Sequence, residues 1–252
     1  MERRLSATGV KEGPSKAVVL AAGEGTRLRP LTLERPKPML PIGGRPLLAH
    51  TLEWLRRHGV EEVAINLHHL PHAVMATFGD GRAFGLRIRY SVEERLLGTA
   101  GALSRFLDFF DERPFYVVYG DLLTAVDLKD LFRFHREKGG VGTVALYRVP
   151  NPAECGLVDV DEAGRIRRFV EKPPPAEVFT DLANAGIYVL EPRVLTYIPQ
   201  GPYCDFGRDV FPRLLAAGER LFGYPIRQYL LDIGTLEKYH QAQEDWAAGR
   251  VR

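Results

Sequence analysis

Residues 16–42 read KAVVLAAGEGTRLRPLTLERPKPMLPI, and the rest of the chain is organised around them. Their first part, residues 17–21, is a short apolar run with two β-branched valines, which is typical of a buried parallel strand. Gly23 and Gly25 follow it, where they allow a tight turn and can present backbone N–H groups to an anion. The stretch therefore predicts a strand followed by an anion-binding turn.

Positive charge and proline are both dense after this turn. The basic residues are Arg27, Arg29, Arg35 and Lys37. The prolines are Pro30, Pro36, Pro38 and Pro41. Prolines at this density exclude a regular helix. We therefore expect a stiff, extended loop whose basic side chains bind a polyphosphate.

Three other interpretations of the G-x-G pattern compete with phosphate binding. A dinucleotide-binding fingerprint requires a third glycine where Leu28 stands, and a P-loop requires G-K-[ST] after the glycines. An ordinary strand-to-loop turn stays open, although the cationic cluster makes it the weaker interpretation.

The size and charge of the chain limit the classes of protein to which it can belong. With 252 residues, of which 45% are hydrophobic, it can form one large α/β domain with a sizeable core. The formal net charge is +2, and residues 1–16 account for it with Arg3, Arg4, Lys11 and Lys16 against Glu2 and Glu12. A balanced remainder argues against a dedicated nucleic-acid binder.

The sequence also bears on the compartment. Cys155 and Cys204 allow at most one disulfide, so the chain is not a disulfide scaffold. Residues 1–15 lack the apolar core of a signal peptide, and we expect them to form a flexible tail. No apolar run reaches membrane-spanning length. We therefore expect a cytoplasmic protein that does not bind membranes.

Alternating strand and helix patterns predict an α/β fold, with a parallel sheet and helices on its faces. The expected strands cover residues 63–67, 86–90, 114–119, 141–149 and 184–190, and a hairpin pairs 155–160 with 165–170. The expected helices cover residues 45–58, 71–78, 98–109, 128–138, 206–217 and 235–248. No internal repeat is found.

His68, His69 and His72 follow an expected strand and could bring two imidazoles together. A zinc site normally needs a third protein ligand, and no Cys or carboxylate joins them nearby. We therefore interpret them as loop histidines.

LAAGEGTRLRPLT at residues 20–32 and PKPMLPI at residues 36–42 resemble the signature of the sugar-1-phosphate nucleotidylyltransferases, which join an NTP to a sugar phosphate. The resemblance covers roughly residues 16–246. It implies a Rossmann-like α/β fold of the nucleotide-diphospho-sugar transferase type, with a mixed, mainly parallel sheet flanked by helices. Within a single domain, 16–252, it implies an NTP-binding half, 16–150, a sugar-phosphate-binding half, 151–232, and a C-terminal helix, 235–248. No hexapeptide array follows, so we expect no C-terminal β-helix.

The resemblance also implies which residues bind the nucleotide. They are Leu20, Ala21, Ala22, Gly23, Gly25, Thr26, Arg27, Gly98 and Thr99. By position, Glu93 matches the side chain that reads the base edge, although its neighbour Glu94 stays open. A carboxylate only accepts hydrogen bonds, and guanine offers two adjacent donors, so Glu93 favours GTP.

Two aspartates that follow apolar segments match the metal-binding residues of the resembled family. Asp121 follows the strand expected at 114–119, and Asp232 follows Leu231. Carboxylates at the carboxyl ends of parallel strands point into the ligand crevice. Magnesium prefers few carboxylates and completes its octahedron with phosphates and waters. Asp121 could instead cap a turn and Asp232 a helix, although Thr235 could cap that helix equally well.

The E-K-P element at residues 171–173 resembles the family's sugar-phosphate clamp. By that resemblance, Glu171 accepts hydrogen bonds from sugar hydroxyls and Lys172 holds the phosphate, while Gly156 and Asn184 contact the sugar. Without the resemblance, the Glu-Lys pair would be an exposed ion pair of little energetic value. Cys155 replaces an aromatic residue often found beside this glycine.

The reaction implied by the resemblance is attack of a sugar-1-phosphate oxygen on the α-phosphorus of an NTP. Arg27 and Lys37 would hold the departing pyrophosphate, and Asp121 would hold Mg²⁺ with Asp232. We expect mannose 1-phosphate and GTP as substrates, because N-A-G-I-Y and D-V-F-P look most like bacterial guanylyltransferases. The alternatives are glucose 1-phosphate with dTTP or UTP, a heptose or non-sugar phosphate acceptor, and an inactive regulatory subunit. The sequence leaves the oligomeric state open, a homo-oligomer included.

Overall fold

The computed structural model describes residues 13–251 and has a nine-stranded sheet at its centre. Strand β1 (Lys16–Leu20) pairs in parallel with β4 (Glu62–Leu67) on one side and with β6 (Phe115–Tyr119) on the other. Val18 packs into one hydrophobic cluster and Val19 into another, because successive residues of a strand face opposite sides of the sheet. Burial on both faces explains why this strand is an unbroken apolar run.

The sheet is mixed, as expected. Its other strands are β5 (Arg87–Val92), β8 (Gly142–Arg148), β9 (Gly156–Val160), β10 (Ile166–Glu171), β11 (Leu182–Leu190) and β12 (Leu221–Pro225). They follow one another in the order β12-β8-β11-β6-β1-β4-β5, and the β9–β10 hairpin joins β11 alongside. The four strands β6, β1, β4 and β5 are parallel, whereas β11 runs antiparallel to both β6 and β8.

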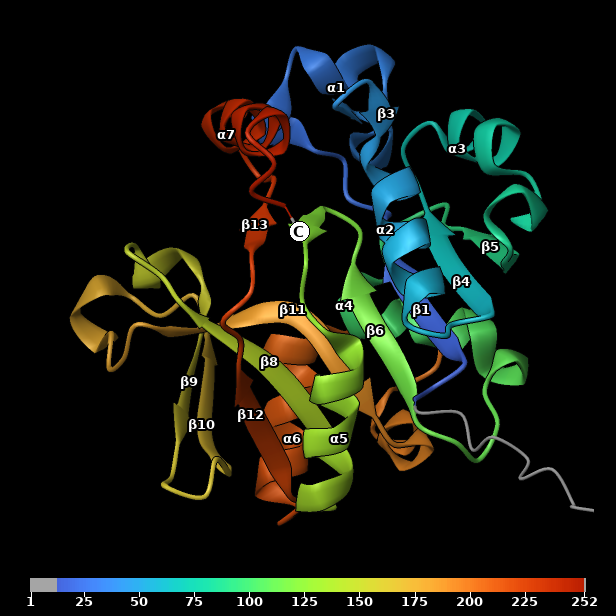
Figure 1. The fold of residues 1–252 in the computed structure, drawn as a ribbon. Coiled ribbons are helices and arrows are strands. Elements are labelled where there is room, and N and C mark those ends of the chain that lie inside the picture. Colours follow the sequence, from blue (N-terminus) through green and yellow to red (C-terminus); the bar gives the residue numbers. More distant parts are fainter. Residues whose placement is uncertain (1–12, 252) are drawn as a thin grey trace, which may run out of the picture.

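Helices cover both faces of the sheet (Figure 1). On one face, α2 (Leu47–Arg57), α3 (Pro71–Phe78) and α5 (Leu128–Lys138) contribute leucine, valine and phenylalanine side chains to the cluster that contains Val19. On the other face, the 3₁₀ helix Ala102–Phe109 and α6 (Phe211–Ala216) contribute to the cluster that contains Val18. The expected fold class, a sheet flanked by helices, is confirmed.

A smaller layer lies at one end of the sheet, where Figure 1 shows α1, β3 and α7 close together. Its strands form two short antiparallel pairs, β2 (Pro41–Ile42) with β3 (Arg45–Pro46), and β7 (Leu122–Thr124) with β13 (Leu230–Asp232). Helix α7 (Leu236–Ala247) packs on both pairs. The buried residues of this layer are Leu28, Leu40, Ile42, Leu47, Leu123, Ile233, Tyr239 and Ala242. They attach the 16–42 stretch to β7 and β13.

The prediction that an extended loop follows the glycine turn is wrong. The segment forms three short helical turns, Thr26–Leu28, α1 (Leu31–Glu34) and Lys37–Met39. Pro30 and Pro36 stand immediately before the second and third of these turns. Proline is excluded from the interior of a helix but not from its first turn, so short turns tolerate a density that a long helix would not.

Two predicted helices are more irregular than expected. The helix predicted at 98–109 begins as α4 (Gly98–Gly101) and continues as a 3₁₀ helix with a break at Phe106, where φ is −129°. The helix predicted at 206–217 opens with a π turn, Phe206–Val210, before α6. In contrast, α3 and α5 begin and end at the predicted residues.

The tail predicted at residues 1–15 lies largely outside the described residues. Of its last residues, Pro14 and Ser15 are buried. The Ser15 carbonyl accepts hydrogen bonds from the backbone N–H groups of Glu61 and Glu62, at 2.8 and 3.1 Å. The ordered fold therefore begins before β1.

Three further observations concern features that are missing from residues 13–251. None of their helices combines the length and the apolar composition that crossing a membrane requires. Cys155 and Cys204 are both free thiols. The elements of this range include no β-helix.

Candidate functional site

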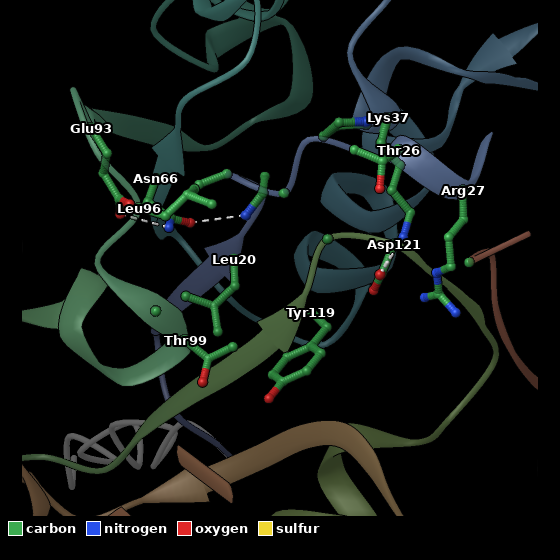
Figure 2. A pocket seen from close by; sticks show the side chains of 18 of the residues that line it. Leu20, Thr26, Arg27, Lys37, Asn66, Glu93, Leu96, Thr99, Tyr119 and Asp121 are labelled. Atoms are coloured by element: carbon green, nitrogen blue, oxygen red, sulfur yellow. Dashed lines mark hydrogen bonds and ion pairs between the residues drawn. The ribbon is translucent and has the colours of Figure 1, made fainter. Parts of the chain in front are cut away.

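A cavity of about 390 Å³ opens beside the carboxyl ends of β1 and β6, where Leu20 and Tyr119 line it (Figure 2). Open α/β sheets bind their ligands at this edge, because the loops that leave the strands diverge there. The walls come from the loops after β1, β5 and β6.

Most residues predicted to bind the nucleotide or to act on it line this cavity. They are Leu20, Ala21, Ala22, Gly23, Gly25, Thr26, Arg27, Lys37, Glu93, Gly98, Thr99 and Asp121. The lining residues that sequence reasoning missed are Pro38, Asn66, Leu96, Tyr119, Gly120, Tyr203 and Gly234. Asn66 was detectable, because it is the single polar side chain near the carboxyl end of the apolar run 63–67.

The turn after β1 depends on Gly25 more than on Gly23. Gly25 has φ +64°, and a Cβ at this position would lie 2.9 Å from Thr32 Cγ2. The Thr32 hydroxyl donates a 2.8 Å hydrogen bond to the Gly25 carbonyl. A Cβ at Gly23 would meet nothing within 4 Å. The geometry of the turn therefore requires a glycine only at residue 25.

The cavity has a charged end, formed by three residues predicted to be catalytic. Lys37 Nζ donates to Asp121 Oδ2 at 2.5 Å, across 84 residues of sequence. The Lys37 side chain is 12% exposed and that of Asp121 is 28% exposed, so this pair is partly shielded from water. A Cβ at Gly234 would lie 3.0 Å from Arg27 Nη2, which brings the guanidinium to the same end.

Asp121 and Asp232 lie close together, as the resemblance implied. Asp121 directly precedes β7, Asp232 ends β13, and the two strands pair with Leu122 opposite Asp232. The Ile233 N–H donates to the Asp121 carbonyl at 2.9 Å. Thr235, not Asp232, caps α7, because its Oγ1 accepts from the Lys238 N–H at 3.3 Å.

The electrostatics of Asp232 are those of a carboxyl group held near a second acid. Burial, and then the negative charge of Asp121, raise the pKa of Asp232, while Lys37 and Lys238 oppose the shift. Its Oδ1 is enclosed and has no hydrogen-bond partner among residues 13–251. A buried acceptor without a partner is uncommon and fits a site that a cation completes.

Only part of the basic cluster read from the sequence reaches the cavity. Arg27 and Lys37 line it, whereas Arg29 and Arg35 are exposed and do not. The short helical turns explain this division, since they rotate successive side chains to different sides of the segment.

At the opposite end of the cavity, Glu93 is 4% exposed and is already hydrogen-bonded. Its Oε1 accepts from Asn66 Nδ2 at 2.9 Å and its Oε2 from the Leu97 N–H at 3.0 Å (Figure 2 shows the first). Asn66 Oδ1 in turn accepts from the Ala21 N–H at 2.8 Å. Glu93 therefore joins the loop after β5 to the end of β1. Glu94 is exposed and does not line this cavity.

The G-T-A-G loop is fastened to residues 203–206, which come from the other half of the chain. The Thr99 hydroxyl donates to Asp205 Oδ2 at 2.7 Å and accepts from the Phe206 N–H at 2.9 Å. Gly98 has φ +81°, and a Cβ there would lie 2.4 Å from the Cys204 carbonyl oxygen. This glycine permits a close backbone approach.

The residues predicted to bind the sugar phosphate lie outside the cavity lining. Glu171 ends β10 in a narrow space, since a Cβ at Gly156 would be 2.5 Å from its Oε2 and one at Gly207 would be 2.6 Å away. Burial, and then the negative charge of Asp205, raise the pKa of Glu171. Glycine at both positions leaves the room that this carboxylate occupies.

Asn184 and Lys172 are each constrained by nearby backbone. Asn184 Nδ2 donates to the Tyr188 hydroxyl at 2.8 Å, and that hydroxyl donates to the Tyr119 hydroxyl at 3.1 Å. Because Tyr119 lines the cavity, this chain of hydrogen bonds connects Asn184 to it. Lys172 has φ +49°, and its N–H donates to the Cys155 carbonyl at 3.1 Å.

The loop histidines bond to the backbone and form no metal cluster. His68 Nδ1 lies 2.7 Å from the Glu93 carbonyl oxygen, and His69 Nε2 lies 2.8 Å from that of Thr32. Within residues 13–251, no group of three His, Cys, Asp or Glu side chains could hold a metal ion. A pair of carboxylates is a different case, because magnesium takes phosphates and waters as its other ligands.

Comparison with known proteins identifies the family. The model of the family described as "Nucleotidyl transferase" matches residues 16–249. A mannose-1-phosphate guanylyltransferase of Mycobacterium tuberculosis is 42% identical over 236 residues, which are 92% of this chain and 65% of that protein. A UTP–glucose-1-phosphate uridylyltransferase of Synechocystis sp. is 39% identical over 241 residues, 90% of this chain and 62% of that protein. The chain thus spans less than two thirds of the length of these relatives.

A solved structure agrees on the fold. HddC from Yersinia pseudotuberculosis superposes with a TM-score of 0.78 at 24% identity, over 92% of this chain and all of that one. At this identity the likeness concerns the fold alone.

Proposed function

Because the chain belongs to the nucleotidyl transferase family, we propose that it transfers a nucleotidyl group from an NTP to a sugar 1-phosphate, with Mg²⁺ as cofactor. The products are an NDP-sugar and pyrophosphate. One observation carries the proposal: one carboxylate and two cations line the charged end of a single cavity beside the parallel strands, and a second carboxylate lies next to them. These groups are Asp121, Asp232, Lys37 and Arg27.

The chemistry requires charge neutralisation more than proton transfer. A phosphate oxygen of the sugar 1-phosphate attacks the α-phosphorus and forms a new P–O bond. The bond from the α-phosphorus to the oxygen that bridges it to the β-phosphorus breaks, and pyrophosphate leaves with that electron pair. The attacking phosphate is already ionised at pH 7, so the reaction needs no general base, and catalysis depends on positioning and electrostatics.

Repulsion between the two anionic substrates is the main barrier that the protein must lower. Two unit charges about 4 Å apart repel by about 4 kcal/mol at an effective dielectric constant near 20. Lys37 and Arg27 lie where they would hold the pyrophosphate portion, and we assign Lys172 to the phosphate of the acceptor. Asp121 and Asp232 would hold Mg²⁺, which supplies charge neutralisation and a template for the phosphates when bound.

For the nucleotide and the sugar, we favour GTP and mannose 1-phosphate. Each Glu93 oxygen accepts one hydrogen bond from the protein and keeps one lone pair, so the carboxylate can still accept from the two adjacent donors of guanine. Glucose 1-phosphate with UTP or dTTP is the second candidate, because the uridylyltransferase relative is nearly as similar as the guanylyltransferase. Two free thiols fit a reducing compartment, and we propose the cytoplasm.

A substrate matrix tests this function. GTP, ATP, UTP, dTTP and CTP are each combined with mannose, glucose and heptose 1-phosphates in the presence of Mg²⁺, and pyrophosphate release is measured. We expect the highest kcat/KM for GTP with mannose 1-phosphate, and loss of activity in EDTA. Pyrophosphate release that is highest for UTP with glucose 1-phosphate would refute the substrate assignment alone. No release with any pair would refute the reaction and favour a regulatory protein.

A further inference from the structure

Tyr203 is an aromatic side chain that lines the cavity and yet is 60% exposed. Exposure of a large ring costs free energy, because apolar surface stays in contact with water. The Tyr203 hydroxyl has no hydrogen-bond partner among residues 13–251 that would explain its position. Neither a hydrogen bond of the hydroxyl nor burial of the ring therefore explains why a tyrosine stands at the cavity.

The backbone next to Tyr203 is firmly held, although the ring is exposed. The Cys204 N–H donates to the Leu97 carbonyl at 2.9 Å, and the Cys204 carbonyl accepts from the Ala100 N–H at 3.0 Å. A Cβ at Gly98 would lie 3.1 Å from Tyr203 Cζ. The ring thus reaches over the G-T-A-G loop from a fixed point, which keeps the entropy cost of ordering it low.

The cavity has two chemically different ends. Figure 2 shows Lys37, Asp121 and Arg27 toward one side and Glu93 and Leu96 toward the other. A triphosphate belongs with the cations, so the base of a bound nucleotide must extend toward the second side. Gly98 is near Leu96 in the chain, and the ring that passes over Gly98 is therefore at the base end.

From these contacts we infer that the Tyr203 ring packs against the nucleobase of the bound NTP and contributes to base selection. The inference rests on the proposed function, since it requires a nucleotide in this cavity. Every base has an aromatic face, so the contact adds affinity for all of them, and the larger purines gain most. Leu96, which is 41% exposed, is another apolar side chain that lines the cavity.

Binding measurements separate this role from a structural one. Dissociation constants of GTP, UTP and inorganic tripolyphosphate are measured by calorimetry with Mg²⁺ and without acceptor, for the wild type, Tyr203→Ala and Tyr203→Phe. Leu107→Ala is the control, because Leu107 is 43% exposed and does not line the cavity. Thermal melts establish that each variant folds.

We expect Tyr203→Ala to weaken GTP binding by about tenfold or more and UTP binding by less, because stacking on an aromatic ring has this order of effect. Tripolyphosphate has no base, so its affinity stays within twofold. Tyr203→Phe and Leu107→Ala bind all three ligands as the wild type does. The inference alone would be overturned if Tyr203→Ala bound the nucleotides as tightly as the wild type. It would also be overturned if this variant lost as much affinity for tripolyphosphate as for GTP. A wild type that binds tripolyphosphate but no nucleotide would refute the proposed function as well.

Discussion

Residues 16–150, the proposed nucleotide half, and residues 151–232, the proposed sugar-phosphate half, present the groups that we propose to bind nucleotide and sugar phosphate in different ways. In the first, the groups lie on loops that follow parallel strands, and they line one cavity. In the second, they lie on the antiparallel β9–β10 hairpin and on β11, outside that cavity, and they contact each other or nearby backbone. Parallel strands carry their ligand groups to one edge directly, whereas antiparallel strands need an added chain of contacts such as Asn184–Tyr188–Tyr119.

The comparison predicts that substitutions at the charged end of the cavity, among residues of the proposed nucleotide half, lower kcat more than substitutions elsewhere. Lys37→Ala or Asp121→Asn should lower kcat by about 10²- to 10³-fold, because each removes a preorganised charge from the site where the phosphates react. Pyrophosphate release is the measurement. Arg35→Ala is the matched control, since Arg35 is a nearby exposed cation that does not line the cavity. Near-normal turnover in either test variant would reject the role given to this pair.

The residues proposed to bind the sugar phosphate should affect the acceptor alone. Lys172→Ala is expected to raise KM for the sugar 1-phosphate by about 10- to 100-fold, which is the loss of one charge-assisted hydrogen bond, and to leave KM for the NTP within twofold. Initial rates at varied concentrations of each substrate measure both constants. Arg167→Ala, an exposed cation on the same hairpin, should change neither. If Lys172→Ala raised KM for the NTP as much as KM for the sugar 1-phosphate, the assignment of Lys172 to the acceptor would be rejected.

Two glycines in the loop after β1 are expected to differ in how much they contribute to stability. Gly25→Ala should destabilise the fold by about 1–2 kcal/mol, because an alanine at φ +64° is strained and its Cβ would press on Thr32. Gly23→Ala is the control, with open space at its Cβ, and should change stability by less than about 0.5 kcal/mol. Urea unfolding measures both. Similar values for the two variants would contradict the geometry of the turn.

The smallest expected effect concerns the charge of Glu171. Its pKa is raised in the folded state, so the native protein holds this proton more tightly than the unfolded chain does. Below the ordinary pKa of the group in the unfolded chain, ionisation of Glu171 does not lower the free energy of unfolding. Above the raised pKa of the folded state, ionisation lowers that free energy by its full amount. Glu171→Gln lacks this cost and should melt about 1–3 °C higher than the wild type at pH 7.

Melting curves across pH test the sign of this effect. The advantage of Glu171→Gln should shrink as pH falls and vanish where the wild-type carboxyl is protonated in both states. Glu177→Gln is the control, because Glu177 is exposed. An advantage that grows at low pH would contradict the argument.

Sequence reasoning selected most of the residues that line the cavity, because they follow one another in two short loops. A buried apolar strand sets the position of Leu20, and the residues after it must then lie at the same edge. The short helical turns were missed, since the proline rule was applied to the whole segment rather than to each turn. The side chain of Glu93 was located but not its bonds to Asn66 and Leu97, which depend on how β4 and β5 are aligned.

Contacts between distant segments explain most of what the sequence did not reveal. Strand β7 is only three residues long and forms because β13 pairs with it, so no local pattern marks it. The attachment of residues 203–206 to Thr99 likewise depends on tertiary packing. Asp121 and Asp232 were paired by resemblance, and their proximity is a result of this strand pairing.

The pairing of β7 with β13 also has a consequence for biosynthesis. A nascent chain emerges from the ribosome N-terminus first, so Asp121 emerges well before Asp232 has been translated. Strands β1, β4, β5 and β6, which pair in parallel, all precede Asp121 in the chain, so they are synthesised first. The strand pairing that brings the two carboxyl groups together can therefore form only late in synthesis, after residue 232 has emerged.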